Sequence, residues 1–159
     1  MSLETVKAYF RRLGMEDRVM EFETSSATVE LAAEAAGVEP ARIAKTLSFR
    51  KGDGCVLVVA AGDARIDNRK FRDAFGVKAK MLSPDEVLAM VGHPVGGVCP
   101  FEVKEGVPVW LDESLKRFDV VYPAAGSANS AVALTPDELF RCAGVAGWTD
   151  VCKLPEPLQ

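Results

Sequence analysis

The chain has little to offer a metal ion: His93 is its single histidine in 159 residues. The four cysteines, at positions 55, 99, 142 and 152, form no C-x-x-C pair. A zinc site needs several such ligands at short, regular spacings, and no acidic residues cluster around His93. We therefore expect neither a metal nor another cofactor. Cys55 and Cys142 stand among apolar residues, where cysteine usually acts as a small core side chain.

Long apolar runs are also absent. No stretch approaches the roughly 18 residues that a helix needs to span a bilayer. Residues 1–14 have an amphipathic helical pattern but lack the apolar block and the cleavage site of a signal peptide. From these absences we expect a cytoplasmic protein without a membrane partner.

Several common sequence signatures are missing. The chain contains no Walker A loop, no G-x-G-x-x-G and no G-x-S-x-G motif, which argues against the usual nucleotide-binding and serine-hydrolase classes. What is there is ordinary for a globular protein, with 48% hydrophobic and 26% charged residues. The length predicts one domain over residues 1–159. Two prolines and few apolar residues predict a frayed tail at 153–159.

Helix and strand patterns alternate irregularly. Helical patterns with recognisable start or stop residues cover 1–14, 28–37, 40–45, 68–76, 84–91 and 136–144. Strand patterns cover 18–22, 45–50, 55–62, 77–82, 107–111, 118–124 and 130–135, and the sequence KGDG at 51–54 predicts a hairpin turn. Because hairpins mix with helices, the order favours an α+β fold with a mixed sheet or small barrel over a doubly wound parallel sheet.

Three segments are candidates for a site. In GHPVGGVCPF, residues 92–101, two adjacent glycines lie between two prolines; this is either a plain turn or a place where backbone approaches a ligand without a Cβ in the way. Lys45 lies among apolar residues where a short helix is expected to pass into a strand, so its amine either reaches solvent or points into a cleft. Ser127 and Asn129, in GSANS, either line a site or stabilise a turn.

Charge is uneven along the chain. The segment 65–80 holds six basic and two acidic residues, against a net charge of −4 for the whole protein. On a continuous helix, Arg65, Arg69 and Arg72 would share one face. This face is either a phosphate-binding patch, to which Lys70 would also belong, or an ordinary solvated surface.

Four segments in this order carry a resemblance: TVELAAEAAGVEPARIAKTLSF, AAGDARIDNRKF, GHPVGGVCPF and VWLDESLKRFDVVYPAAG. Together they resemble the YbaK family, which includes the editing domains associated with prolyl-tRNA synthetase. The likeness runs from about Thr24 to Leu139. It implies a mixed, barrel-like sheet wrapped by helices, and a free-standing protein that hydrolyses mischarged aminoacyl-tRNA in trans.

The resemblance also implies roles for individual residues. Lys45 matches the family's functional lysine, near the terminal adenosine and the ester, and residues 96–100 match its G-x-x-x-P loop. Gly96 and Gly97 would then offer backbone N–H groups to the substrate carbonyl oxygen. The remaining expected substrate contacts are Thr46, His93, Val98, Cys99, Pro100, Ser127 and Asn129. The expected tRNA contacts are Arg65, Arg69, Lys70 and Arg72. The partners implied are the 3′ end of an aminoacyl-tRNA and an aminoacyl-tRNA synthetase, not DNA.

Two departures from the family pattern bear on the amino acid that is removed. Some members that edit alanine carry a histidine in the segment corresponding to GSANS, where this chain has none. Glu102 follows Phe101 where the family loop often continues with glycine. Two other readings stay open: a hydrolase that uses Cys99 and His93, and a non-catalytic module that binds a tRNA end or a synthetase.

Overall fold

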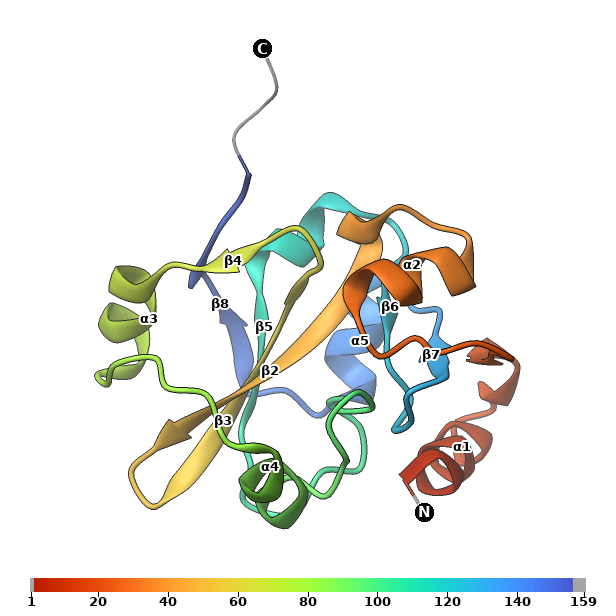
Figure 1. Cartoon of the computed structure of the whole chain (residues 1–159), viewed down its shortest axis with the longest axis horizontal. Helices are drawn as coiled ribbons and strands as arrows, with labels where there is room; N and C mark the ends of the chain where they lie inside the picture. Colours follow the sequence, from red (N-terminus) through yellow and green to blue (C-terminus); the bar gives the residue numbers. More distant parts are fainter. Residues whose placement is uncertain (1, 156–159) are drawn as a thin grey trace.

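The computed structural model describes residues 2–155 and shows a mixed α+β architecture around a curled, five-stranded sheet (Figure 1). The strand order is β6-β2-β3-β5-β8. β2 and β3 form an antiparallel hairpin, while β6, β5 and β8 join the sheet by parallel pairing. Two short antiparallel pairs, β1 with β7 and β4 with β9, extend the structure beside this sheet. The expected fold class is confirmed.

The element bounds are as follows. The helices are α1 (Ser2–Arg12), α2 (Val29–Ala36), α3 (Asn68–Phe75), α4 (Pro84–Met90) and α5 (Pro136–Cys142), with 3-10 turns η1 (Glu16–Arg18), η2 (Pro40–Arg42) and η3 (Glu113–Arg117). The strands are β1 (Val19–Glu21), β2 (Ile43–Lys51), β3 (Gly54–Ala61), β4 (Arg65–Ile66), β5 (Val109–Asp112), β6 (Tyr122–Pro123), β7 (Ser130–Val132), β8 (Gly147–Thr149) and β9 (Cys152–Lys153).

Most helices begin where the sequence places a capping residue. The side chains of Thr28, Asp67, Ser83 and Thr135 each accept a hydrogen bond from a backbone N–H in the first turn. Ser83 and Thr135 belong to complete capping boxes. At the other end of α2, Gly37 has the left-handed conformation, with φ +73°, that ends a helix most easily in glycine.

Three local expectations were wrong. Residues 40–45 do not form a helix: the 3-10 turn ends at Arg42, and Lys45 lies inside β2. The segment 77–82 is not a strand; it touches the sheet through a single bridge between Met81 and Phe49. Arg65 lies in β4, before Asp67 starts α3, so the basic residues of 65–80 do not share one helix.

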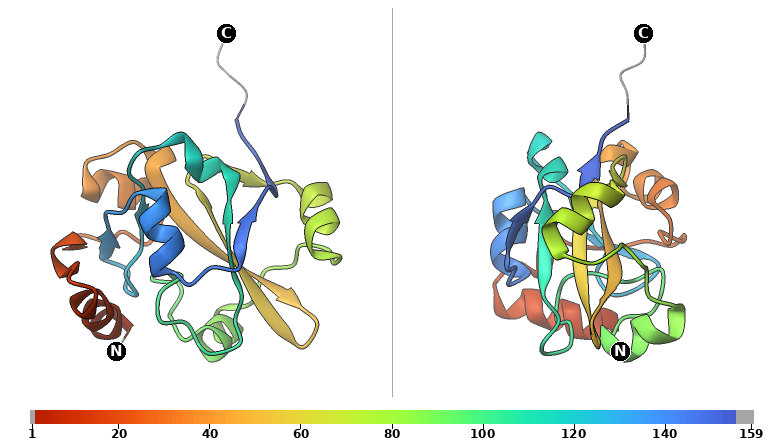
Figure 2. Two further views of the ribbon diagram at one scale, coloured as in Figure 1. Left: turned by 180° about the vertical axis from the view of Figure 1, so that it is seen from behind. Right: turned by 90° about the vertical axis from the view of Figure 1, so that its left-hand side faces the viewer.

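The core forms around β3, whose residues 55–61 are all buried. A strand that is apolar on both faces must be covered on both sides, and Figure 2 shows α2 and α4 on one side of the sheet and α5 on the other. Phe10 of α1 stacks edge-on against Phe101, and both rings are fully buried. Cys55 and Cys142 are buried as expected.

A short strand, β9, lies near the C-terminal end of the described residues. Cys152 and Lys153 pair with Ile66 and Arg65 in the β4–β9 ladder. The ladder therefore includes Lys153, the first residue of the expected frayed tail. Residues 156–159 of that tail lie outside the described part of the chain. Among the described residues, no helix is long and apolar enough to cross a membrane.

Candidate functional site

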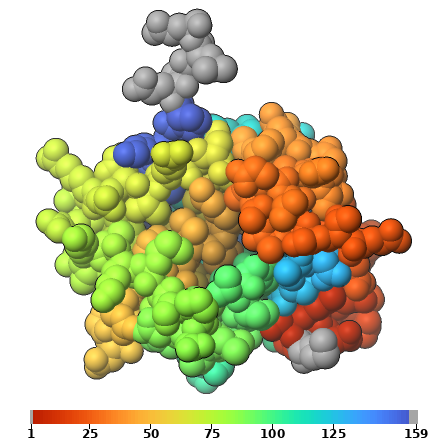
Figure 3. Space-filling model, in the orientation of Figure 1, coloured from red at the N-terminus to blue at the C-terminus, as the bar shows by residue number. Residues whose placement is uncertain are grey.

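A cavity of about 480 Å³ opens on the face of β2 that α2 and α4 flank. The surface is hollowed there, and β2 is visible at the bottom (Figure 3). Residues from β2, the start of α2, α4, β7 and the glycine loop, residues 92–101, line it, and most are apolar. Lys45 is the single charged residue among the lining residues, and none of them is a histidine, cysteine, aspartate or glutamate.

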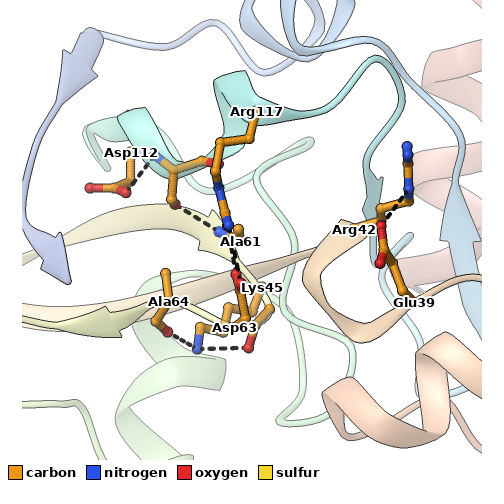
Figure 4. Close-up of polar contacts among 10 residues, drawn as sticks. Glu39, Arg42, Lys45, Ala61, Asp63, Ala64, Asp112 and Arg117 are labelled. Carbon is orange, nitrogen blue, oxygen red and sulfur yellow. Dashed lines mark hydrogen bonds and ion pairs between the residues drawn. The ribbon is translucent and has the colours of Figure 1, made fainter. Parts of the chain in front are cut away.

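Lys45 is half-buried in the wall of this cavity. Its ammonium Nζ donates to the carbonyl oxygens of Ala64, at 2.5 Å, and Gly62, at 3.4 Å (Figure 4). Burial lowers the pKa of Lys45 from its ordinary value, because an ammonium loses hydration there. Backbone carbonyl groups therefore hold the amine in the cavity wall. Of the two positions considered from the sequence, solvent and cleft, the structure shows the cleft.

The glycine loop contributes Gly96 and Val98 to the cavity wall. Gly96 has φ +93°, a conformation that favours glycine. Within residues 2–155, the backbone N–H groups of Gly96 and Val98 donate to no protein acceptor. They are thus available to an oxygen atom of a ligand.

Gly97 differs from Gly96 in its surroundings. Its N–H already donates to the carbonyl oxygen of Pro94, at 3.0 Å, and it is not among the residues that line the cavity. A Cβ at this position would lie 2.6 Å from the backbone nitrogen of Ser127. Gly97 therefore packs closely against a second loop, and its N–H is already paired within the protein.

His93 and Cys99 belong to the loop and lie together in the interior, outside the cavity lining. The His93 Nε2 atom is 2.7 Å from the carbonyl oxygen of Phe101, which can only accept, so Nε2 carries the proton. The Cys99 Sγ atom is 3.5 Å from the same nitrogen. Complete burial raises the pKa of the Cys99 thiol to about 12. A protonated Nε2 cannot take the thiol proton, so the geometry opposes a cysteine–histidine hydrolase.

Ser127 and Asn129 stabilise a turn beside the site. The Ser127 hydroxyl bonds to Asn129 and to Ser130 Oγ, and the Asn129 amide donates to the Phe22 carbonyl oxygen. Neither residue lines the cavity, and neither does the buried Pro100. Ser130, one residue beyond the predicted pair, does line it.

Thr46 is the remaining predicted residue that lines the cavity. Its hydroxyl is buried and has no hydrogen-bond partner among the described residues. An unpaired buried hydroxyl is costly, and this one lies in a residue of the cavity wall. Sequence reasoning missed Ser26, Ser48 and Tyr122, which also line the cavity. Ser48 is two residues after Thr46 and so lies on the same face of β2, and this alternation could have indicated it.

The basic residues outside the cavity separate into two groups. Arg69 and Arg72 are exposed on α3, and Arg65 is exposed on β4. Lys70 instead donates to the Asp150 carboxylate, at 3.1 Å, and to the Cys152 carbonyl oxygen, at 3.0 Å. Lys70 therefore fastens the C-terminal segment to α3.

Comparisons with known proteins show the family of the chain. Residues 23–142 match the family model described as the aminoacyl-tRNA editing domain. The chain is 58% identical over 154 residues to the uncharacterized protein YwhH of Bacillus subtilis (strain 168), which covers 96% of this chain and 98% of that protein. It is 32% identical over 77 residues to a proline–tRNA ligase of Thermotoga sp. (strain RQ2), a match that covers 48% of this chain and 13% of the ligase.

A solved structure has the same fold. The crystal structure of a proposed trans-editing enzyme for prolyl tRNA synthetase superimposes with a TM-score of 0.85 and 29% identity, over 96% of this chain and 97% of that one. The family model covers the segments that form the cavity, from the start of α2 through β7. This chain belongs to the aminoacyl-tRNA editing domain family.

Proposed function

We propose that this protein, as one domain, hydrolyses the ester bond of a mischarged aminoacyl-tRNA in trans. The observation that carries the proposal is the fixed, half-buried amine of Lys45 in the wall of an otherwise uncharged cavity, in a chain of the editing-domain family. The cavity is large enough for a small ligand group such as an aminoacyl ester.

The proposed reaction needs no protein nucleophile. Water attacks the ester carbonyl carbon, the bond to the ribose oxygen breaks, and that oxygen leaves with a proton from the water. The N–H groups of Gly96 and Val98 would donate to the carbonyl oxygen as it gains negative charge. Lys45 would act as a point cation near the ester and the terminal nucleotide. Since no lining residue is a conventional base, placement and charge stabilisation carry the catalysis.

The tRNA body would lie outside the cavity. Arg65, Arg69 and Arg72 are exposed and suit phosphate contacts, whereas Lys70 is already paired. Such contacts position a nucleic acid without reading its sequence. We propose a cytoplasmic protein that meets the 3′ end of an aminoacyl-tRNA, with a synthetase as a further partner, as the similarity to proline–tRNA ligase suggests.

A deacylation assay on a panel of mischarged tRNAs tests the proposal. Wild type should release one or a few amino acids, and Lys45→Ala should lose about a hundredfold or more of the rate, as for removal of one charge-stabilising group. Cys99→Ser is the matched control, because that residue lies outside the cavity lining, and its rate should stay within a few fold of wild type.

Three outcomes would contradict the proposal. Wild-type turnover by folded Lys45→Ala would remove the lysine from the mechanism. An inactive Cys99→Ser variant would restore the cysteine hydrolase. Tight binding of tRNA without release of any amino acid would favour the non-catalytic module.

A further inference from the structure

The position of the Lys45 ammonium depends on the short turn between β3 and β4. Both of its acceptors, the carbonyl oxygens of Gly62 and Ala64, belong to this turn. The turn is closed by a hydrogen bond from the Ala64 N–H to the Ala61 carbonyl oxygen, at 3.0 Å. Any shift of the turn therefore moves the two groups that hold the amine.

One side of the turn is fixed by close packing. A Cβ at Gly62 would lie 2.1 Å from the carbonyl oxygen of Pro40, so the backbone of the turn rests directly on η2. This contact limits movement toward η2 but holds no polar group of the turn.

The other side is fixed by an ion pair. Asp63, between the two acceptor residues, accepts from both ends of the Arg117 guanidinium, at 2.6 and 3.1 Å (Figure 4). Arg117 also donates from Nε to the Ser114 carbonyl oxygen, at 2.9 Å. The Ser114 hydroxyl in turn accepts from the Ala61 N–H, at 3.1 Å. A two-pronged arginine–carboxylate pair fixes direction as well as distance.

We propose that Asp63 and Arg117 are positioning residues for Lys45: through the β3–β4 turn they hold its ammonium in the cavity wall. The inference rests on the proposed function only for the effect of the pair on hydrolysis. The effect of the pair on the position of the Lys45 ammonium does not depend on that function. Neither side chain lines the cavity, so both would act through the turn and through charge.

Besides holding the turn, Asp63 influences the pKa of Lys45 through its charge. Burial is the largest influence and lowers the pKa of Lys45; Cys152 of β9, Asp63 of the turn and Glu30 of α2 act to raise it, while Arg65 of β4 acts to lower it. Loss of the Asp63 charge would remove one of the groups that raise the pKa of Lys45, so less of the amine would be charged at a given alkaline pH.

The test compares Asp63→Asn and Arg117→Lys with a matched control, Glu138→Gln. Glu138 forms the same kind of two-pronged pair with Arg18, at 2.9 and 3.0 Å, but ties η1 to α5 and does not touch the β3–β4 turn. Each full-length variant is titrated with ¹³Cε-labelled lysine, in which the Lys45 signal is assigned by Lys45→Arg. Deacylation is then measured as kcat and KM.

We expect Asp63→Asn to lower the pKa of Lys45 and to lower kcat about tenfold, with KM within about twofold, since a misplaced group near the ester affects the chemical step. Arg117→Lys keeps the positive charge but loses the two-pronged hydrogen bonding to Asp63. Its kcat should therefore fall, while the pKa of Lys45 should stay closer to the wild-type value than in Asp63→Asn. Glu138→Gln should change neither quantity.

The proposal is overturned if Asp63→Asn and Arg117→Lys, both folded by thermal melting, match Glu138→Gln in the Lys45 titration and in kcat. A change in KM alone would also overturn it, because that assigns the pair to tRNA binding. If wild type hydrolyses no substrate, the proposed function fails, whereas the titration still decides whether Asp63 and Arg117 control Lys45.

Discussion

At the scale of single residues, Gly97 lies where two loops pack closely together. Its neighbours across the loop are backbone atoms of Gly126 and Ser127, which cannot rotate away from an added methyl group. Gly97→Ala should therefore lower the unfolding free energy by about 1 to 3 kcal/mol, the usual cost of forcing extra volume into a packed site. Urea denaturation measures this loss.

The control for that substitution is Gly54→Ala. Gly54 has only one atom, the Lys51 carbonyl oxygen, near an added Cβ, at 3.8 Å. The unfolding free energy of the Gly54→Ala protein should therefore stay close to that of wild type. A Gly97→Ala protein as stable as Gly54→Ala, but inactive, would return Gly97 to the role of a direct substrate contact.

His93 predicts a dependence of stability on pH. Burial lowers its pKa below the ordinary value of 6.5. With Nε2 donating to Phe101, a second proton must go to Nδ1, which is buried and has no partner in residues 2–155. The folded state therefore resists protonation more than the unfolded state does. The resulting stability is complete above about pH 6.5 and is lost as the pH falls toward the folded-state pKa.

The measurement is the unfolding free energy at pH 7.5 and at pH 5.0. Wild type should lose up to about 2 kcal/mol more of its unfolding free energy than His93→Gln does. This is the limit for one proton between about pH 6.5, where the unfolded histidine begins to titrate, and pH 5.0. Equal losses in the two proteins would show that the histidine is protonated in place without cost.

At the scale of elements, the sequence predicted what local chemistry decides. Thr28, Asp67 and Thr135 cap the helices they precede, because a capping side chain needs only the next three residues. The same local reasoning placed Lys45 at the end of a helix and was wrong. There the 3-10 turn ends at Arg42, since pairing with β3 begins at the next positions.

The helix α3 carries the prediction that belongs to this scale. Asp67 and Gly76 bound this helix. Arg69 and Arg72 therefore lie on it, and Arg65 does not. Charge reversal at both should raise KM for tRNA and flatten its dependence on salt, because fewer counterions are released. With a minimal acylated substrate, kcat should stay nearly unchanged.

Arg141→Glu serves as the control, because Arg141 is exposed on α5, on the opposite side of the sheet from α2 and α4. Its effect on the salt dependence should be small. An identical salt slope in the Arg69 and Arg72 double variant and in wild type would assign the outer face of α3 to solvent.

At the scale of the whole molecule, the cavity could not be assembled from the sequence. Lys45 and Gly96 were identified through family motifs, but nothing local indicates that Ser26, Tyr122 and Ser130 meet them. The last two strands were missed for the same reason. β8 pairs with β5 and β9 with β4, and such short strands have no pattern apart from their distant partners.

The C-terminal segment therefore supplies the last prediction. Val151 donates to the buried Asp112 carboxylate, at 2.9 Å, Cys152 and Lys153 pair with β4, and Lys70 holds the Cys152 carbonyl oxygen. β4 directly follows the turn that fixes Lys45. Removing residues 151–159 should leave the Asp112 carboxylate without this donor, which costs about 1 to 3 kcal/mol, and should also lower kcat. Removing only residues 156–159 takes away none of these contacts and should preserve both melting temperature and activity. If the longer deletion melts and turns over like the shorter one, the β4–β9 ladder is not part of the support for the site.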